Sequence, residues 1–304
     1  LMKVLSYHQP ILQHIQHPVF QEAGVRALVW REDLNHPQIS GNKWWKLKYN
    51  ILEAQRLQHS TLLTFGGAYS NHIYAVAAAA RELGFKSIGV IRGEEVLPLN
   101  NTLAFASQSG MTLHYIARSS YREKTSHEFL TSLQQQYGEF YMIPEGGTNA
   151  FAIQGCAEWG KELLLMDFDI LFLPVGTGGT ISGIIKAFNN QRKILGVSVL
   201  KGDFHTPDIL SLLKESDPKI NPTQAYGNWS VATSYHHGGY AKVTPALIDF
   251  IQAMNRSHNL PLDPVYTGKM MWAVMEEVKK GTFARGTTIL ALHTGGLQGA
   301  APIL

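Results

Sequence analysis

The sequence predicts an α/β protein of two domains, each a mostly parallel sheet with helices on both faces. From residue 43 onward, short apolar strand-like runs alternate with helical patterns, and helices of about 10–15 residues between strands are typical of parallel sheets. The length of 304 residues suggests two domains of about 150 residues each. Hydrophobic residues make up 45% and charged residues 16%, which excludes a disordered chain and allows a sizeable core.

The first half of the chain carries regularly alternating patterns. Trp44, Leu47, Ile51 and Ala54 recur at helical spacing and predict a helix over 43–57. Further helices are expected at 71–83, 101–109, 124–137 and 150–165. Strands are expected at 61–65, 87–91, 112–116 and 140–143.

The second half is expected to begin with a buried strand over 169–175. A helix, a strand over 194–200, another helix and a last strand over 287–292 follow. Residues 201–240 are rich in Gly, Pro, Asn and His, which predicts a long irregular loop region with a functional role. Ligands of such sheets bind beyond the carboxyl ends of the strands, so we expect the site there, in a cleft between the domains.

The composition argues against several classes of partner. The net charge of +3 is too small to indicate a nucleic-acid partner. The single cysteine, Cys156, excludes an intramolecular disulfide framework and a cysteine-based zinc cluster. No apolar run reaches the roughly 18 residues of a membrane span, and no signal sequence stands out. We therefore expect a cytoplasmic protein that binds neither nucleic acid nor membrane and carries no metal.

The strongest local signal is a glycine-rich loop after the strand 169–175, with the residues Gly176, Thr177, Gly178, Gly179 and Thr180. Glycines let the backbone approach an anion closely, and the amides and hydroxyls at the following helix start can bind it. A phosphate site is the favoured interpretation, with a plain tight turn as the alternative. Ile181 stands where a dinucleotide fingerprint needs glycine, and a near-match to the P-loop at 155–162 has Glu162 in place of the hydroxyl. A small monophosphate cofactor remains.

Three other loops carry residues suited to chemistry. Lys43 stands at a helix start just after Gly41, where burial and the helix end would favour the neutral, nucleophilic amine; a solvated surface lysine is the alternative. Residues 66–72 form a second junction between strand and helix, where Ser70 or Asn71 could instead be a helix cap. Residues 293–296 form a third glycine-rich loop after the last strand.

Six motifs together resemble pyridoxal-phosphate enzymes of fold type II, the tryptophan-synthase-β type. More narrowly, the sequence is similar to the 1-aminocyclopropane-1-carboxylate (ACC) deaminase / D-cysteine desulfhydrase family. The motifs occur in the family's order and span residues 40–299. They are Gly41-Asn42-Lys43-x-x-Lys46-Leu47, Gly66-Gly67-x-x-Ser70-Asn71, Gly176-Thr177-Gly178-Gly179-Thr180, Gly238-Gly239-Tyr240, Asp263-Pro264-Val265-Tyr266-x-Gly268-Lys269 and His293-Thr294-Gly295-Gly296.

The resemblance implies a role for each matching position. Lys43 would be the Schiff-base lysine and later the base that removes the substrate's α-proton. The implied catalytic residues are Lys43, Ser70, Tyr240 and Tyr266. The implied cofactor-binding residues are Lys43, Asn71 (to the ring oxygen), Gly176, Thr177, Gly178, Gly179 and Thr180 (to the phosphate), and Thr267 and Thr294 (near the pyridine nitrogen). The expected substrate-binding residues are Tyr69, Ser70, Asn71 and His72.

Thr267 and Thr294 bear on the choice of reaction. The resemblance implies a carboxylate near the ring nitrogen in enzymes that open the cyclopropane ring, whereas this chain matches the D-cysteine desulfhydrase branch with hydroxyls. The implied reaction is α,β-elimination from a small amino acid, with D-cysteine giving pyruvate, sulfide and ammonia. ACC deamination is the alternative within the class, and a non-catalytic pyridoxal-phosphate or metabolite-binding protein is the alternative outside it.

The resemblance also implies how the chain is organised. A small domain over 43–150 would be inserted into a large cofactor domain over 1–42 and 151–304, and the protein would form a homodimer. Ser40, Trp45 and Tyr69 depart from the residues common in the family. These departures leave open which amino acid is bound.

Overall fold

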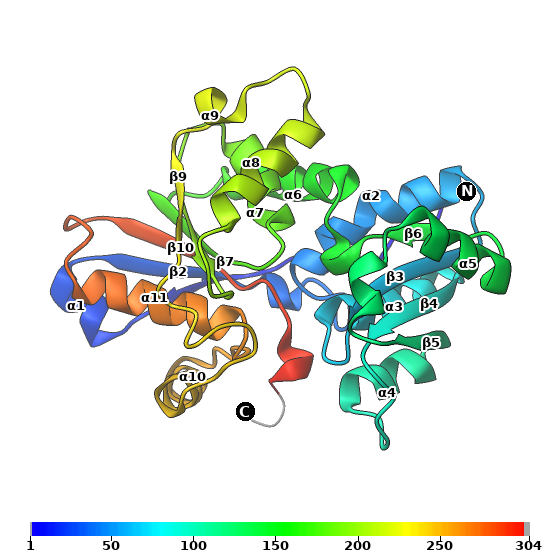
Figure 1. The fold of residues 1–304 in the computed structure, drawn as a ribbon. Helices are drawn as coiled ribbons and strands as arrows, with labels where there is room; N and C mark the ends of the chain where they lie inside the picture. The colour runs from blue at the N-terminus through cyan, green and yellow to red at the C-terminus, as the bar shows by residue number, and fades with distance from the viewer. Residues whose placement is uncertain (1, 301–304) are drawn as a thin grey trace.

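The computed structural model describes residues 2–300 as two lobes, each with its own sheet (Figure 1). The larger sheet has the order β1-β2-β10-β7-β8-β9, and the smaller has the order β5-β4-β3-β6. Strand β1 runs antiparallel to β2, and all other recorded pairs are parallel. The strands of the larger sheet are β1 (Leu12–Ile15), β2 (Arg26–Trp30), β7 (Ile170–Val175), β8 (Lys193–Ser198), β9 (Trp229–Ala232) and β10 (Thr288–Leu292). Those of the smaller sheet are β3 (Thr61–Gly67), β4 (Lys86–Arg92), β5 (Met111–Ile116) and β6 (Tyr141–Ile143).

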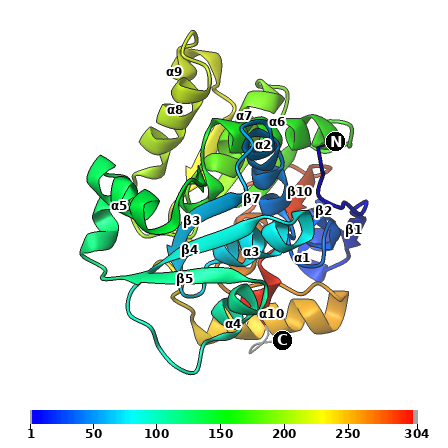
Figure 2. The same cartoon turned by 90° about the vertical axis from the view of Figure 1, so that its right-hand side faces the viewer.

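Helices cover both faces of both sheets, and Figure 2 shows the smaller lobe from its own side, in front of the larger one. The α-helices are α1 (Pro18–Ala23), α2 (Asn42–Arg56), α3 (Asn71–Leu83), α4 (Asn101–Gln108), α5 (His127–Tyr137), α6 (Ala150–Leu163), α7 (Gly179–Phe188), α8 (His205–Ser216), α9 (Pro222–Ala225), α10 (Pro245–His258) and α11 (Thr267–Lys279). Short 3-10 turns are η1 (Glu32–Leu34), η2 (Ser120–Glu123), η3 (Glu145–Gly147) and η4 (Leu297–Gly299).

The larger sheet is buried on both faces because its central strands are apolar throughout. Along β7, Leu171 and Leu173 pack with the helices α2, α6 and α7, whereas Ile170 and Phe172 point to the opposite core with α1, α10 and α11. This alternation follows from the two-residue period of a strand. A strand buried on both sides reads as a continuous apolar run, as β7 does.

The smaller sheet has the same three-layer build. Leu63 and Phe65 of β3 pack against Leu133 of α5 on one face. Leu62 of the same strand packs with Ile73 of α3 on the other face. The predicted fold class, two three-layer α/β domains with mostly parallel sheets, is therefore confirmed.

Helix α2 joins the lobes because it packs closely on α6 of the larger one. A Cβ at Gly155 would overlap the carbonyl of Trp45, so glycine permits this approach. The rings of Trp45 and Trp159 stack there with centroids 6.1 Å apart. Lys43 is thus carried by a helix that is fixed by a large buried contact rather than by its own first turn.

Three regions differ from the expectation drawn from sequence. The segment 201–240, expected to be irregular, contains α8, α9 and β9, and Ile209 and Leu213 of α8 are fully buried. One helix was expected between the strands 194–200 and 287–292, whereas α8, α9, α10 and α11 lie there. The N-terminal elements β1, α1 and β2 were not predicted at all. The remaining expected elements lie where they were placed, with ends shifted by at most three residues. Among the described residues, no helix is both long enough and apolar enough to cross a membrane.

Candidate active site

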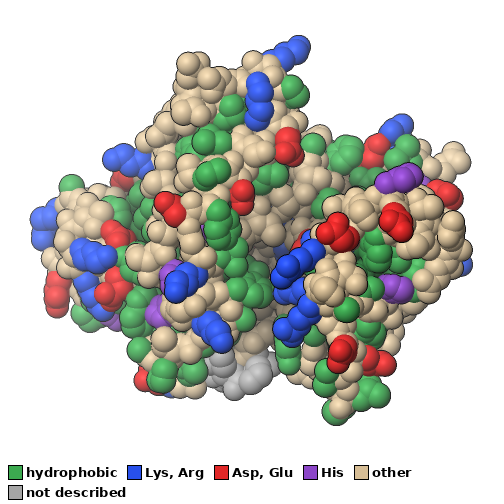
Figure 3. Space-filling view, in the orientation of Figure 1, with side chains coloured by type: hydrophobic (Ala, Val, Ile, Leu, Met, Phe, Trp, Pro, Cys, Tyr) green, Lys and Arg blue, Asp and Glu red, His purple; other side chains and the backbone are tan. Residues whose placement is uncertain are grey.

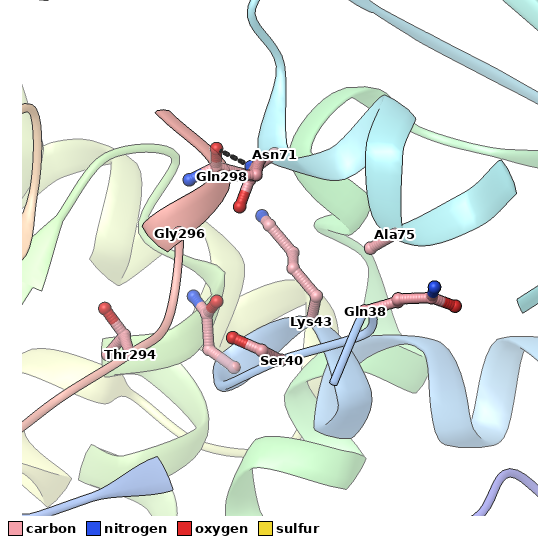
Figure 4. A pocket seen from close by; sticks show the side chains of 9 residues that line it. Gln38, Ser40, Lys43, Asn71, Ala75, Thr294, Gly296 and Gln298 are labelled. Atoms are coloured by element: carbon pink, nitrogen blue, oxygen red, sulfur yellow. Dashed lines mark hydrogen bonds between the residues drawn. The ribbon is translucent and has the colours of Figure 1, made fainter. Parts of the chain in front are cut away.

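The loops at the carboxyl ends of β3, β7 and β10 converge with the start of α2 between the lobes (Figures 1 and 4). The start of α2 and the loops after β3 and β10 line a pocket in which the side chain of Lys43 extends toward Asn71 (Figure 4). The convergence follows from parallel strands ending at the same edge of a sheet. The lining residues are Gln38, Ser40, Asn42, Lys43, Asn71, Ala75, Thr294, Gly296 and Gln298.

A glycine turn sets the start of α2. Gly41 has φ +70° and ψ −140°, a conformation that side-chain-bearing residues rarely adopt. The Asn35 side chain brackets it, accepting from Gly41 N at 2.8 Å and donating to Gly41 O at 3.2 Å. Asn42 N then donates to Thr294 O at 3.3 Å. The turn before Lys43 is thus tied both to η1 and to the loop after β10.

Behind this turn lies the buried carboxylate of Glu32. It accepts hydrogen bonds from Trp45 Nε1 at 2.7 Å, Trp30 Nε1 at 2.5 Å, Asn35 Nδ2 at 2.9 Å and Tyr7 OH at 3.3 Å. Burial raises the pKa of Glu32 to about 7, and the four donors act in the opposite direction. Because its carboxylate accepts four hydrogen bonds, Glu32 acts as a hub that fixes Asn35 and Trp45 around α2.

Lys43 has the environment of a nucleophilic amine. Its Nζ donates to the carbonyl of Gly146 at 3.2 Å. Burial and, next, the neighbouring ammonium of Lys46 lower the pKa of Lys43 well below its usual range. The lowered pKa favours the neutral amine, which is the form that attacks a carbonyl carbon.

Lys46, one helical turn further, connects α2 with the loop after β7. Its Nζ donates to Gly146 O at 3.0 Å, Thr148 Oγ1 at 3.1 Å and Thr177 Oγ1 at 3.4 Å. Only 2% of the residue is exposed, and this burial lowers the pKa of Lys46 to about 8. A largely charged ammonium therefore lies below the glycine loop at neutral pH.

The loop 176–180 forms a cradle without side chains that would fill it. Gly178 caps α7 with φ +82°, and a Cβ at Gly179 would lie 2.7 Å from Thr148 Oγ1. The exposed Thr177 hydroxyl lies 2.6 Å from that of Thr148. Hydroxyls, the ammonium of Lys46 and the start of α7 are the donor set of a phosphate site. The residues present therefore fit the phosphate of pyridoxal phosphate, with Lys43 in the same cleft to hold the aldehyde carbon.

Thr180 is engaged differently from Thr177. Its Oγ1 accepts from Asn42 Nδ2 at 2.9 Å, so it links the two loops to each other. Gly176 lies against the ring of Tyr266, and a Cβ on Gly176 would be only 3.2 Å from that ring. Tyr266 and the exposed Tyr240 meet edge to face with centroids 6.3 Å apart, and burial and then Tyr240 raise the pKa of Tyr266 well above its usual range.

The loop after β3 presents Tyr69, Ser70 and Asn71 in three different ways. Tyr69 is 76% exposed. The Ser70 Oγ accepts from the amides of His72 and Ile73 at 3.2 Å each, so it caps α3. Asn71 accepts from the side chain of Gln298 in η4, as the dashed line in Figure 4 shows.

His72 lies below this loop rather than in the pocket. It is 2% exposed, and its Nε2 lies 2.8 Å from Thr64 Oγ1, while Nδ1 has no hydrogen-bond partner in the described part of the chain. Burial, then Lys43 and Lys46, lower the pKa of His72 well below its usual range. The imidazole is neutral next to two lysines, and its predicted contact with substrate stays a prediction.

The two threonines predicted near the pyridine nitrogen are in different places. Thr294 lines the pocket. Thr267 is fully buried, and its hydroxyl donates to Asp263 Oδ1 at 2.7 Å and accepts from Asp263 N at 2.9 Å. The hydroxyl proton of Thr267 is therefore used within its own turn, and only Thr294 is free to face a ligand.

The sequence reasoning missed Lys46, Thr148 and Gln298 as site residues. Thr148 follows β6 in the run Glu145-Gly146-Gly147-Thr148. The rule that ligands bind beyond the carboxyl ends of parallel strands, which was applied to the other loops, would have indicated Thr148 as well. The position of Lys46, one helical turn after Lys43, could have indicated that it belongs to the site. No sequence pattern indicates Gln298, because its contact with Asn71 depends on how the two lobes pack against each other.

Comparison with known proteins gives relatives along almost the whole chain. A putative ACC deaminase of Pyrococcus abyssi is 30% identical over 92% of this chain and 87% of its own. The bifunctional D-cysteine desulfhydrase/ACC deaminase of Arabidopsis thaliana is 27% identical over 98% of this chain and 80% of its own. The D-cysteine desulfhydrase of Yersinia enterocolitica is 24% identical over 90% and 87%.

Solved structures give the same result. The crystal structure of an ACC deaminase homologue superposes with a TM-score of 0.85 at 26% identity, covering 98% of this chain and 92% of that one. An O-ureido-L-serine synthase, at 13% identity and a TM-score of 0.69, shares the fold. The family model described as "Pyridoxal-phosphate dependent enzyme" matches residues 10–295. This chain belongs to the pyridoxal-phosphate-dependent enzyme family.

Proposed function

We propose that the protein catalyses α,β-elimination from a small β-substituted amino acid, with D-cysteine as the first candidate. The observation that carries this proposal is the arrangement of the low-pKa amine of Lys43 beside Asn71, with Lys46, which donates to the same Gly146 carbonyl as Lys43, reaching Thr177 of the cradle. The desulfhydrases of Yersinia and Arabidopsis, which the chain resembles, support the choice of substrate.

In this proposal each side chain has a defined task. Lys43 holds the cofactor, Lys46 and Thr177 bind its phosphate, and Asn71 faces its ring oxygen. When bound, pyridoxal phosphate supplies an electron sink for the charge that develops at the substrate's Cα. Ser70 and the start of α3 orient the substrate carboxylate, and Tyr240 and Tyr266 cover the reacting carbons.

Lys43 also moves the proton. Its neutral amine accepts the α-proton as the Cα–H bond breaks, and the Cβ–S bond breaks with its electron pair leaving on sulfur. A Cα–Cβ double bond forms, and water converts the three-carbon product to pyruvate and ammonia. Pocket walls that hold Lys43 between Gly146 and Asn71 keep the amine in place for both roles.

ACC deamination is the second candidate, supported by the names of the Pyrococcus relative and of the solved homologue. Two features argue against it. Among residues 2–300, those that line the pocket include no carboxylate, and the nearby Asp263 carboxylate accepts from the backbone amides of residues 265–267. Without a carboxylate to keep the ring nitrogen protonated, the electron sink is weaker than ring opening requires.

The organisation of the protein forms part of the proposal. We propose a small domain over 43–150 inserted into a large domain over 1–42 and 151–304, a homodimeric assembly, and a cytoplasmic location. Sedimentation of the purified protein tests the dimer.

The absorption spectrum tests the central assignment. The purified protein should show the visible band of lysine-bound pyridoxal phosphate, and D-cysteine should change it while pyruvate and sulfide form. Lys43→Ala should abolish the band, whereas Lys48→Ala on the same helix, which pairs with Glu158 at 2.7 Å, should keep it. A band that D-cysteine leaves unchanged would refute the substrate. A protein without any band after incubation with the cofactor would be a non-catalytic binder.

A further inference from the structure

Two arginines flank one turn at the carboxyl edge of the smaller sheet. Arg92 is the last residue of β4, and Arg118 comes two residues after β5. A Cβ at Gly93 would lie 3.9 Å from Arg118 Nε, so both side chains flank the same turn. Both residues are exposed. Figure 3 shows Lys and Arg side chains gathered on the edge of this lobe that faces the hollow between the lobes.

Neither arginine has an acidic partner among residues 2–300, although other cations nearby do. Lys124 pairs with Glu145 at 3.2 Å, whereas the ion pairs recorded for the described residues include neither Arg92 nor Arg118. The guanidinium of Arg92 lies over the ring of Tyr121, 5.6 Å from its centroid. Stacking on a buried ring orients a guanidinium and leaves its donors free for an anion.

The position of Arg92 relates it directly to the substrate loop. Arg92 is the parallel partner of Gly67 in the β3–β4 ladder, and a Cβ at Gly67 would lie 3.5 Å from Arg92 Nη2. Gly67 O in turn accepts from Ser70 N at 3.0 Å. The guanidinium therefore flanks the turn that presents Ser70, at the outer side of the proposed substrate site.

The distance from the substrate loop to Arg92 is short. A substrate whose α-carboxylate binds at Ser70 has the guanidinium of Arg92 beside the same turn, because Arg92 Nη2 lies against Gly67 and Gly67 O accepts from Ser70 N. A neutral substrate of three carbons has no group that would use these donors.

We propose that Arg92 and Arg118 form a second anion subsite, and that the natural substrate is an amino acid whose β-substituent carries a negative charge. This inference rests on the proposed elimination reaction and specifies its substrate class. The α-carboxylate binds at the start of α3, and the distal anion binds the two guanidinium groups at the cleft edge. Two arginines without acidic partners give a bidentate site suited to a carboxylate, sulfonate or phosphate.

The test compares two amino acids of nearly equal shape, S-carboxymethylcysteine and its neutral amide, S-carbamoylmethylcysteine, each as both enantiomers. Binding to the holoenzyme is measured by titrating the cofactor absorption, and turnover by pyruvate release. The wild-type protein should bind the anionic compound at least about tenfold more tightly, a preference in the range of charge-assisted hydrogen bonds. Arg92→Gln and Arg118→Gln should each reduce that ratio by about three- to tenfold.

The control variant is Arg56→Gln, which removes the same charge at the end of α2, where Arg56 pairs with Glu53. It should leave the ratio unchanged. A binding ratio near one in the wild-type protein would overturn the subsite. An equal loss of affinity for both compounds in Arg92→Gln would also overturn it, and would assign Arg92 to the α-carboxylate instead.

Binding and turnover separate the two proposals. A binding preference that the arginine variants abolish, without pyruvate from either compound, would keep the subsite and refute the elimination. Pyruvate from both compounds with equal affinity would keep the elimination and refute the subsite. Raising the salt from low to high concentration should weaken binding of the anionic compound alone, since salt screens an exposed site.

Discussion

Replacing Gly41 by alanine tests whether the turn before Lys43 builds the site. Gly41 has φ +70° and ψ −140°, outside the left-handed helical region, and such a backbone costs a residue with a side chain about 1–3 kcal/mol. The added Cβ would also overlap the Thr294 carbonyl and lie 2.6 Å from Gly295 N. Both are backbone atoms, so no rotamer change can relieve the overlap.

The expected loss follows from these two contributions. Overpacking against atoms that cannot rotate away costs about 1–3 kcal/mol, so Gly41→Ala should lower the free energy of unfolding by about 2–6 kcal/mol. The backbone shift should also move Lys43 away from Asn71. We therefore expect the variant to bind pyridoxal phosphate weakly even under conditions where it is folded.

Gly281→Ala provides the matched control. Gly281 has φ +72°, and a Cβ there would meet nothing within 4 Å, so only the conformational cost of about 1–2 kcal/mol applies. Urea unfolding followed by tryptophan fluorescence gives the stability, and the visible band gives cofactor occupancy. Equal losses of stability in the two variants, or full cofactor occupancy in Gly41→Ala, would contradict the reasoning.

Three further predictions concern buried charged groups. Lys46→Met should weaken binding of pyridoxal phosphate by about 10- to 100-fold, as expected for a lost charge-assisted hydrogen bond, and should leave binding of phosphate-free pyridoxal unchanged in a fluorescence titration. In the cofactor-free protein, Lys46 has a pKa of about 8 and an unfolded value near 10.4, so the unfolded state holds more protons between these values. Stability should therefore rise with pH over that interval, and Lys46→Met should flatten the rise measured by urea unfolding. Glu32→Gln should cost about 1–3 kcal/mol in the same assay at pH 8, because the new amide NH₂ faces N–H donors of Trp30, Trp45 and Asn35 and leaves at least one unsatisfied; an unchanged stability would show that the hub is dispensable.

The fold class and the central site could be predicted from the sequence because their signals are local. The strand 170–175 is apolar throughout and ends in a glycine-rich run, so both its burial and the loop after it can be read without neighbours. The signal for Lys43, a lysine at a helix start just after a glycine, is also contained in a few neighbouring residues. The family comparison then confirmed the fold class and the cofactor.

The rest depends on contacts between distant parts of the chain. Strand β2 is not recognisable alone, because it is defined by pairing with β10 roughly 260 residues away. Packing likewise sets the hydrogen bond that the Thr267 hydroxyl donates to Asp263. It also sets the burial of His72 near Lys43 and Lys46. In 201–240, frequent glycines and prolines concealed the apolar spacing of α8.

The place of β10 also determines when the protein can become an enzyme. This strand lies between β2 and β7, and the loop after it supplies the Thr294 carbonyl that holds the Gly41 turn. A ribosome adding about 5–20 residues per second needs roughly 12–50 seconds to reach Thr294 after Lys43 has been made. Throughout that interval the larger sheet lacks the strand between β2 and β7, and the turn at Gly41 lacks the Thr294 carbonyl. The site around Lys43 is therefore completed only after nearly all of the chain has been made.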